Sequence, residues 1–251
     1  MSDGKTVVIT GGGKGIGAAI ARIFYENKFH VLIGSRSDSG LADELGARAK
    51  FHPVDVRSPE QLESFIRAAV EWTGKVDVAI NNAGYSQWCP AQDVEEAFWD
   101  QMIDTNLKGV FFGCQAAGSV LKEGSCIINI SSLASKRGSA NNSVYCASKF
   151  GVNGITQALA KEWGKMGIRV NAVCPVYVET QGLLDALEGE HAPPGGASVE
   201  KYLSDFAASQ SSLGTLPTGR EIGQACLFLA SSQASAITGQ CINVDCGVLP
   251  Q

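Results

Sequence analysis

Short apolar runs alternate with longer amphipathic stretches along the chain. The apolar runs predict strands at 6–10, 30–35, 50–54, 76–80, 125–130, 169–174 and 241–245. Apolar positions at helical spacing predict helices at 16–28, 39–47, 59–72, 95–120, 143–165 and 219–230, with a helical patch at 199–209. Strands that alternate with helices are typical of α/β proteins, so we expect a doubly wound parallel seven-stranded sheet with helices on both faces.

The first strand runs into a glycine-rich turn. After Val7–Thr10 come Gly11-Gly12-Gly13-Lys14-Gly15-Ile16-Gly17 and then a helical pattern. Glycines at 11, 15 and 17 permit a tight turn and a close approach of the backbone to a pyrophosphate at the helix N-terminus. A glycine cluster can also be a simple turn, but its place between a strand and a helix favours a Rossmann-type nucleotide site.

A tyrosine and a lysine with catalytic spacing lie in the second half of the chain. Tyr145 and Lys149 are four residues apart and share one helix face, thirteen positions after Ser132. A neighbouring ammonium favours the phenolate, so we expect Lys149 to lower the pKa of Tyr145 and allow proton exchange near neutral pH. Together with a nucleotide cradle, this general acid/base indicates hydride transfer through a carried cofactor.

Several motifs, in order, resemble the short-chain dehydrogenase/reductase family in its single-domain form. They are Thr10-Gly11-x-x-x-Gly15-x-Gly17, Asn81-Asn82-Ala83-Gly84, Asn106 in Asn106-Leu107-Lys108-Gly109, Ser132 with Tyr145 and Lys149, and Thr238-Gly239-Gln240 before Ile242–Asp245. The resemblance runs nearly end to end and implies one dinucleotide-binding and catalytic domain over 1–251, with a mobile substrate lid at about 181–205. The loop-like stretch Gly189–Ser198 falls within that lid.

The resemblance implies a catalytic tetrad of Asn106, Ser132, Tyr145 and Lys149, without a metal. In reduction, Tyr145 would donate a proton to the carbonyl oxygen and the Ser132 hydroxyl would hydrogen-bond that oxygen. Lys149 would also bind the nicotinamide ribose, and Asn106 would hold a water that links Lys149 to solvent. Taken singly, each could be an ordinary surface or cap residue; their common spacing favours catalysis.

The resemblance also implies a set of cofactor contacts. They are Gly11, Lys14, Gly15, Ile16, Gly17, Ser35, Arg36, Asp55, Val56, Asn82, Gly84, Tyr145, Lys149, Pro175, Val178 and Thr180. Asp55 and Val56 resemble the adenine contact, although Asp55 could instead cap the turn at Ser58. Val176 stands where the family usually has a glycine, so its backbone must avoid positive φ. Cys246 also replaces a more usual glycine, with no expected consequence for catalysis.

The end of the second strand bears on the choice between NADP(H) and NAD(H). An NAD enzyme places an acid there for the ribose hydroxyls, whereas an arginine accommodates a 2′-phosphate. Ser35 occupies the acid position and Arg36 follows, with Lys14 approaching from the glycine turn. We therefore predict NADP(H) as cofactor. The alternative is NAD, with Asp38 as the ribose ligand.

The substrate is less defined by the sequence. Candidate lining residues are Gln87, Trp88, Cys89, Leu133, Ala134, Ser135, Lys136, Arg137, Val176, Tyr177 and the 181–205 lid. Lys136 and Arg137 could neutralise a substrate carboxylate or phosphate, or be a solvated pair. We expect a small polar ketone or keto-sugar interconverted with a secondary alcohol. The alternatives are a 3-oxoacyl-carrier-protein-type reductase and a non-catalytic nucleotide-sensing regulator; a nucleotide-sugar epimerase would need a further domain.

Composition restricts the partners. A net charge of −5 and the absence of a long basic run argue against nucleic acid or an anionic membrane. The sequence shows no apolar run long enough to span a bilayer and no signal-peptide pattern, so we expect a cytoplasmic protein. Eight cysteines lack a Cys-x-x-Cys pair and are expected to be reduced thiols, and three histidines show no metal spacing.

The resemblance also predicts a homotetramer or homodimer. The expected interface is formed by the long helices at 95–120 and 143–165. Small and apolar residues would allow close packing there, namely Ala116, Ala117, Gly118, Gly154, Ala158 and Leu159.

Overall fold

The computed structural model describes residues 4–250, and in these the predicted sheet is present. The strands are β1 (Thr6–Thr10), β2 (His30–Ser35), β3 (Ala49–Pro53), β4 (Val78–Asn81), β5 (Cys126–Ile130), β6 (Arg169–Pro175) and β7 (Cys241–Val244). They pair in parallel in the order β3-β2-β1-β4-β5-β6-β7, which confirms the doubly wound seven-stranded sheet. Strand order reverses between β1 and β4, and ligands bind at such a switch point.

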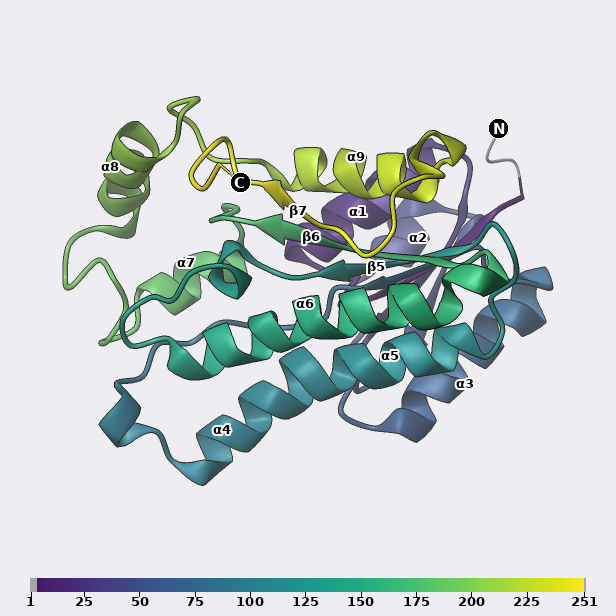
Figure 1. The fold of residues 1–251 in the computed structure, drawn as a ribbon, viewed down its shortest axis with the longest axis horizontal. Helices are drawn as coiled ribbons and strands as arrows, with labels where there is room; N and C mark the ends of the chain where they lie inside the picture. Colours follow the sequence, from purple (N-terminus) through teal and green to yellow (C-terminus); the bar gives the residue numbers. More distant parts are fainter. Residues whose placement is uncertain (1–3, 251) are drawn as a thin grey trace.

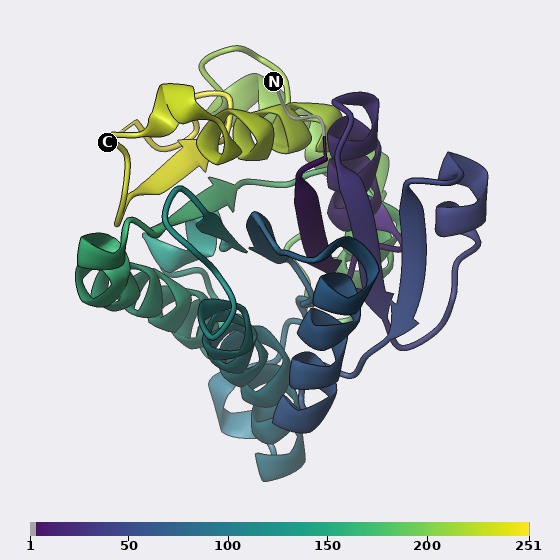
Figure 2. The ribbon, with the colours of Figure 1, turned by 90° about the vertical axis from the view of Figure 1, so that its right-hand side faces the viewer.

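Helices cover both faces of the sheet (Figure 1, Figure 2). One face carries α1 (Gly15–Glu26), α2 (Leu41–Leu45) and α9 (Gly219–Ala230); the other carries α3 (Pro59–Thr73), α5 (Gly109–Gly118) and α6 (Ser143–Trp163). Neighbouring side chains of a strand point to opposite faces. In β1, Val7 and Ile9 belong to the hydrophobic core on the side of α1 and α9, and Val8 belongs to the core on the side of α3, α5 and α6. Burial on both sides explains the uninterrupted apolar runs of the strands.

The helix expected at 95–120 is interrupted. It consists of α4 (Glu96–Ile103), a π turn (Asp104–Lys108) and α5. Asn106, inside the π turn, is buried and exchanges two hydrogen bonds with the main chain of Tyr85. Gly109 lies so close to Val56 that a Cβ would come within 2.9 Å of its Cγ2 atom. These tertiary contacts hold the extra residue of the π turn, a feature often found at functional sites.

The segment 181–205 contains a helix that the sequence did not predict. It is α7 (Gln181–Leu187), capped by Thr180, whose side-chain oxygen accepts a hydrogen bond from Leu183 N at 3.3 Å. The patch expected at 199–209 is α8 (Val199–Gln210). Both lie beyond the carboxyl ends of the strands (Figure 1). Short 3₁₀ turns occur at Ala91–Asp93, Leu133–Ser135, Gly164–Met166 and Ser232–Ala234.

The prediction of interface residues is wrong for most of the small residues on α5 and α6. Three of them belong to the core of the chain itself: Ala116, Ala117 and Leu159. Gly118 lies against the ring of Trp163, within 2.8 Å of where its Cβ would be. They face inward because α5 and α6 pack on the sheet and on each other. Gly154 and Ala158 do lie on the exposed side of α6.

Candidate active site

A cavity of about 820 Å³ opens at the carboxyl ends of the strands, at the switch between β1 and β4. All but one of the expected cofactor contacts line it, as do three members of the expected tetrad. The exception among the cofactor contacts is Pro175. It is buried as the last residue of β6, where it pairs with Val244, and it does not line the cavity, so its contact with the cofactor stays a prediction.

The glycine turn forms a cradle at one end of this cavity. A Cβ on Gly17 would overlap the carbonyl oxygen of Gly11, and one on Gly11 would come within 2.8 Å of Ala83 Cα. Asn82 Nδ2, from the end of β4, donates to the carbonyl oxygens of Thr10 and Gly11 at 3.0 Å. Side chains are therefore excluded where a pyrophosphate would meet the start of α1, and the cradle fits a dinucleotide.

Basic side chains surround the adenosine end of the cavity. Lys14, Arg36 and Arg57 line it, and Asp55 is the only carboxylate among the described residues in its wall. The Arg57 guanidinium hydrogen-bonds both oxygens of Asp55 at 3.0 Å through Nε and lowers the pKa of that carboxyl. Asp38 is outside the wall, where its carboxylate accepts a hydrogen bond from Gly40 N at 2.9 Å ahead of α2. No motif in the sequence predicted that Arg57 lines this cavity.

Ser132, Tyr145 and Lys149 meet at the wall of the same cavity. Ser132 follows β5 and its Oγ accepts a hydrogen bond from Ala134 N at 3.1 Å. Lys149 is only 4% exposed, and its Nζ donates to Ile130 O at 2.9 Å and lies 5.7 Å from the centre of the Tyr145 ring. The helix α6 thus presents both side chains on one face, as their spacing predicts.

The expected lowering of the Tyr145 pKa is not found in the structure. Burial raises the pKa of Tyr145, and the hydrogen bond with Ser132 opposes this only in part. Burial also lowers the pKa of Lys149 to about 8. The expectation was wrong because it counted the charge of Lys149 and omitted the loss of hydration that both groups suffer on burial.

Asn106 lies behind the cavity and is absent from its wall. Its Oδ1 accepts from Tyr85 N at 3.0 Å and its Nδ2 donates to Tyr85 O at 2.8 Å, so the side chain fastens the segment after β4 to the π turn. Gly84 sits beside it, since a Cβ there would meet Asn106 Oδ1 at 2.9 Å and Lys149 Nζ at 3.6 Å. The side chain of Asn106 therefore fixes the main chain of Tyr85, next to Gly84 in the cavity wall.

The substrate end brings together residues from three loops. Those predicted and found in the wall are Gln87, Trp88, Leu133, Ala134, Arg137, Val176 and Tyr177. Cys89, Ser135 and Lys136 were expected there and are absent; Lys136 Nζ instead donates to Cys241 O on β7 at 2.7 Å. Asn142 and Phe206 are in the wall and were missed, although Phe206 follows Tyr202 at helical spacing. Val176 avoids positive φ as expected, whereas Cys246 adopts a φ of 53°.

Residues 4–250 contain neither a cluster of side chains suited to a metal ion nor a helix suited to a membrane. No three histidine, cysteine or acidic side chains there gather as a metal cluster would require. None of the helices in this part of the chain has the length and apolar character to cross a membrane. All eight cysteines are free thiols.

Comparisons with known proteins agree with this geometry. Residues 11–249 match the family model described as enoyl-(acyl carrier protein) reductase. The chain is 34% identical to the 3-oxoacyl-[acyl-carrier-protein] reductase of Chlamydia muridarum, over 97% of each chain. It is 33% identical to the D-threitol dehydrogenase of Mycolicibacterium smegmatis, over 98% of this chain and 93% of the relative.

Two solved structures have folds similar to that of this chain over nearly its full length. The short-chain dehydrogenase/reductase described as glucose/ribitol dehydrogenase from Brucella melitensis superposes with a TM-score of 0.90, at 31% identity over 99% of this chain and 98% of the other. The actinorhodin polyketide ketoreductase, solved with NADPH, gives 0.88 at 32% identity over 97% of each. With a matching family model and such relatives along nearly its full length, the chain belongs to the short-chain dehydrogenase/reductase family of oxidoreductases.

Proposed function

We propose that this protein is an NADP(H)-dependent oxidoreductase that interconverts a small polar ketone or keto-sugar and a secondary alcohol. The observation that carries the proposal is the meeting of Ser132, Tyr145 and Lys149 in the wall of the cavity that begins at the glycine turn. The similarity to a D-threitol dehydrogenase supports a small polyol or ketone as the substrate class. The cytoplasmic location and the single-domain organisation stay predictions from the sequence.

The protein's own residues would move and hold the proton. When bound, the nicotinamide supplies hydride to the carbonyl carbon or accepts it from the alcohol. Tyr145 donates its phenolic proton to the carbonyl oxygen in reduction and takes it back in oxidation. Ser132 hydrogen-bonds that oxygen and stabilises its developing charge. A charged Lys149 beside the ring counteracts the effect of burial on the phenolate. Asn106 positions the segment that carries Gly84.

A 3-oxoacyl-carrier-protein-type reductase is the second candidate, favoured by the similarity to the Chlamydia muridarum enzyme. A reduction panel separates the candidates: NADPH with small ketones and keto-sugars, and NADPH with a 3-oxoacyl group on its carrier protein. Faster turnover of the carrier-bound substrate would support the second candidate. No turnover of any carbonyl, with cofactor still bound, would support the nucleotide-sensing regulator, although the retained Tyr145 and Lys149 argue against it.

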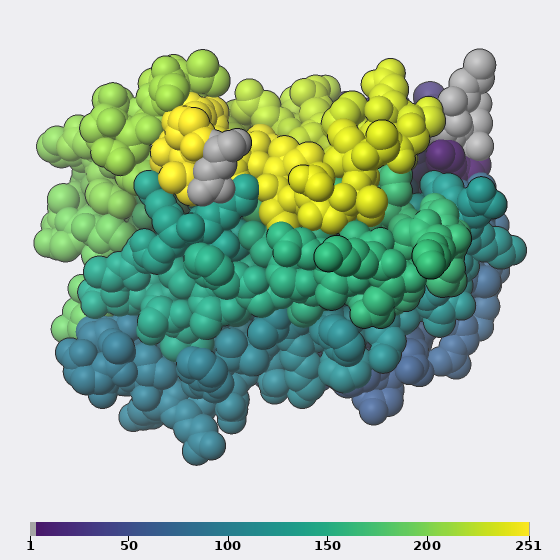
Figure 3. Space-filling view, viewed as in Figure 1, coloured from purple at the N-terminus to yellow at the C-terminus, as the bar shows by residue number. Residues whose placement is uncertain are grey.

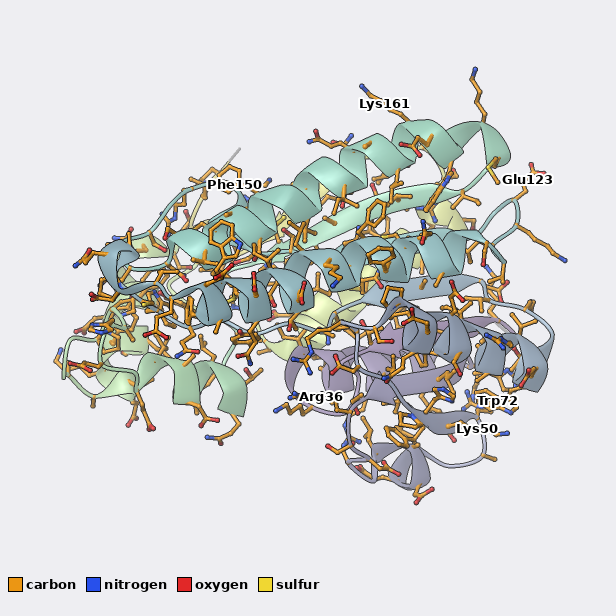
Figure 4. All side chains as sticks on the ribbon, turned by 90° about the horizontal axis from the view of Figure 1, so that it is seen from below. Arg36, Lys50, Trp72, Glu123, Phe150 and Lys161 are labelled. Carbon is orange, nitrogen blue, oxygen red and sulfur yellow. The ribbon has the colours of Figure 1, made fainter. Side chains whose placement is uncertain are left out.

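The preference for NADP(H) rests on charge at the adenosine end. Lys14 and Arg36 line the cavity beside Ser35, and among residues 4–250 neither forms an ion pair. Figure 4 shows Arg36 reaching away from the sheet. The only carboxylate in this part of the described wall, that of Asp55, is already held by Arg57. A 2′-phosphate would therefore find two cations and no competing acid. The NADPH-bound ketoreductase structure is consistent with this preference.

Replacing Arg36 with alanine should selectively weaken the binding of NADPH. A charged hydrogen bond contributes about 1.5–3 kcal/mol, so the dissociation constant should rise by about 10- to 100-fold while that of NADH stays nearly unchanged. Titration followed by tryptophan fluorescence measures both. Asp38→Ala is the control and should alter neither affinity. A selective loss of NADH in Asp38→Ala would mean that the cofactor is NAD and that Asp38 holds its ribose.

We also propose that two copies associate through α5 and α6. Helix α6 lies along one face of the molecule (Figure 3), and Phe150 on its outer side is 49% exposed (Figure 4). Ala147, Gly154 and Ala158 continue an exposed stripe of small side chains at helical spacing. Phe111 on α5 is exposed as well. Close helix packing across such a stripe would bury both aromatic rings.

Phe150→Glu should therefore break the assembly. The wild-type protein should give a light-scattering mass of two or four times 26.3 kDa, and the variant should shift to the single-chain mass, because a buried carboxylate has no partner there. Phe228→Glu, an equally exposed phenylalanine on α9, is the matched control and should remain at least a dimer. A wild-type mass near 26.3 kDa at micromolar concentration would refute the association.

A further inference from the structure

The substrate end of the cavity carries positive charge without a balancing acid. Of the charged residues in the described wall, Lys14, Arg36, Arg57 and Asp55 belong to the adenosine end. The remaining two are Arg137 and Lys149, which lie with Ser132 and Tyr145. Lys149 is held by Ile130 O beneath the reacting position. Arg137 is therefore the cation available to the part of a substrate that extends away from the carbonyl.

Arg137 and its neighbour Lys136 point in different directions. Lys136 Nζ binds Cys241 O at 2.7 Å and is outside the wall. The Arg137 guanidinium forms no ion pair or side-chain hydrogen bond within residues 4–250; only its main-chain N–H is used, donating to Leu133 O at 3.3 Å. Burial raises the pKa of Tyr177 and Arg137 opposes this rise, which places its charge close to that phenol. A planar guanidinium with free donors suits a carboxylate or phosphate.

Asn142 gives a second, independent indication of a polar ligand. It lies three residues before Tyr145 in the wall of the cavity, is 5% exposed, and its buried Oδ1 has no hydrogen-bond partner in the described part of the chain. A buried amide oxygen without a partner is unfavourable, and a ligand that donates a hydrogen bond to it would remove that cost. A hydroxyl on the substrate would satisfy it.

Aromatic side chains form part of the wall at this end. Tyr177 packs edge-on against Phe206 at 4.9 Å, and its hydroxyl shares a hydrogen bond of 3.1 Å with that of Tyr202. Trp88 packs with Leu187 and Leu203 of the 181–205 segment. These side chains bury one another, and Trp88, Tyr177 and Phe206 line the cavity, so the substrate end has an apolar, aromatic surface beside the Arg137 cation.

We infer that the substrate is a small ketone bearing a carboxylate or a phosphate, which binds Arg137 while a neighbouring hydroxyl or other polar group binds Asn142. This inference rests on the proposed function and adds the charge of the substrate to it. Lys136 contributes nothing to recognition because its ammonium is turned toward β7. The two adjacent basic residues therefore form a matched pair for an experiment.

Two pairs of probes separate the anion from the rest of the substrate. Acetoacetate and ethyl acetoacetate differ in a carboxylate, and dihydroxyacetone phosphate and dihydroxyacetone differ in a phosphate. Binding of each to the NADPH-loaded enzyme is measured by calorimetry, and reduction by loss of NADPH absorbance. In at least one pair, the anionic member should bind about 10-fold or more tightly than its neutral partner. The pair with the larger ratio identifies the anion.

Variants then assign the preference. Arg137→Gln should reduce the ratio of affinities within the preferred pair to below about 3-fold by weakening the anionic member alone. Lys136→Gln should keep the wild-type ratio. Asn142→Ala should weaken the binding of dihydroxyacetone and of its phosphate by similar factors. The inference is overturned if neither pair shows a preference, if none of the four probes binds at millimolar concentration, or if Arg137→Gln retains the ratio. An anion preference in binding without reduction of any carbonyl would contradict the proposed function alone.

Discussion

Tyr145→Phe should abolish turnover and leave the fold intact. The substitution removes only the phenolic oxygen, while the ring keeps its packing in the wall of the cavity beside Lys149. Positioned proton transfer contributes about 10²–10⁴-fold to a rate. We therefore expect kcat to fall by at least about 10³-fold, measured by NADPH absorbance with the best ketone of the reduction panel.

The comparison with Ser132→Ala tests the role of the proton. That variant keeps the phenol and loses one hydrogen bond to the reacting oxygen, so its rate should fall by about 10²-fold. Both variants should still bind NADPH, and assays at saturating NADPH separate chemistry from cofactor affinity. A Tyr145→Phe enzyme that kept more than a few per cent of the wild-type rate would refute the proposed mechanism.

The parts of the fold that the sequence predicted are those decided by local pattern. Val7, Val8 and Ile9 are all buried because β1 lies between two helical layers, and a strand covered on both faces must be apolar throughout. The helix after Ser58 begins where expected, since the Ser58 Oγ accepts a hydrogen bond from Gln61 N. In the same way, the four-residue spacing of Tyr145 and Lys149 is enough to place both on one face of α6.

The parts that the sequence did not predict depend on contacts between distant segments. The π turn at Asn106 exists because that side chain binds the main chain of Tyr85, twenty-one positions earlier. The direction of the Lys136 side chain depends on a carbonyl of β7, more than a hundred residues away. Helix α7 is short, and its leucines are stabilised by packing near Trp88. Short elements of this kind gain stability from tertiary packing, which periodicity cannot reveal.

Burial also explains why the predicted direction of the Tyr145 pKa shift was wrong. A sequence shows that a lysine stands four residues away, but the loss of hydration depends on the surrounding fold. Lys149 is 4% exposed, and its main hydrogen bond is to Ile130 O. The same burial that raises the pKa of Tyr145 lowers that of Lys149 to about 8, so the pKa values of the two groups move apart.

Lys149→Met should have the second largest effect on turnover. It removes the ammonium that lies 5.7 Å from the centre of the Tyr145 ring, and it removes the ribose contact expected from the family resemblance. We expect kcat to fall by about 10²–10³-fold. Lys161→Met, an exposed lysine on the same helix, controls for the loss of a charge and should retain activity.

The same variant should change how stability depends on pH. In the unfolded chain a lysine has a pKa near ~10.4, whereas in the folded protein that of Lys149 is about 8. Between these values the unfolded state binds more protons, so the contribution of Lys149 to the free energy of unfolding rises with pH by about 3 kcal/mol in total. Its burial penalty is therefore fully present below about pH 8 and is lost as the pH approaches 10.4.

Lys149→Met removes the burial penalty of the charged lysine. The free energy of unfolding of the variant minus that of the wild type should therefore be most positive near pH 7. This difference should decrease as the pH rises through 8 toward 10. Urea unfolding at fixed protein concentration across this range measures it. The lost hydrogen bond to Ile130 O shifts the difference by the same amount at every pH and does not affect its slope. A difference that stayed constant from pH 7 to pH 10 would mean that Lys149 titrates in the folded protein as it does in the unfolded chain.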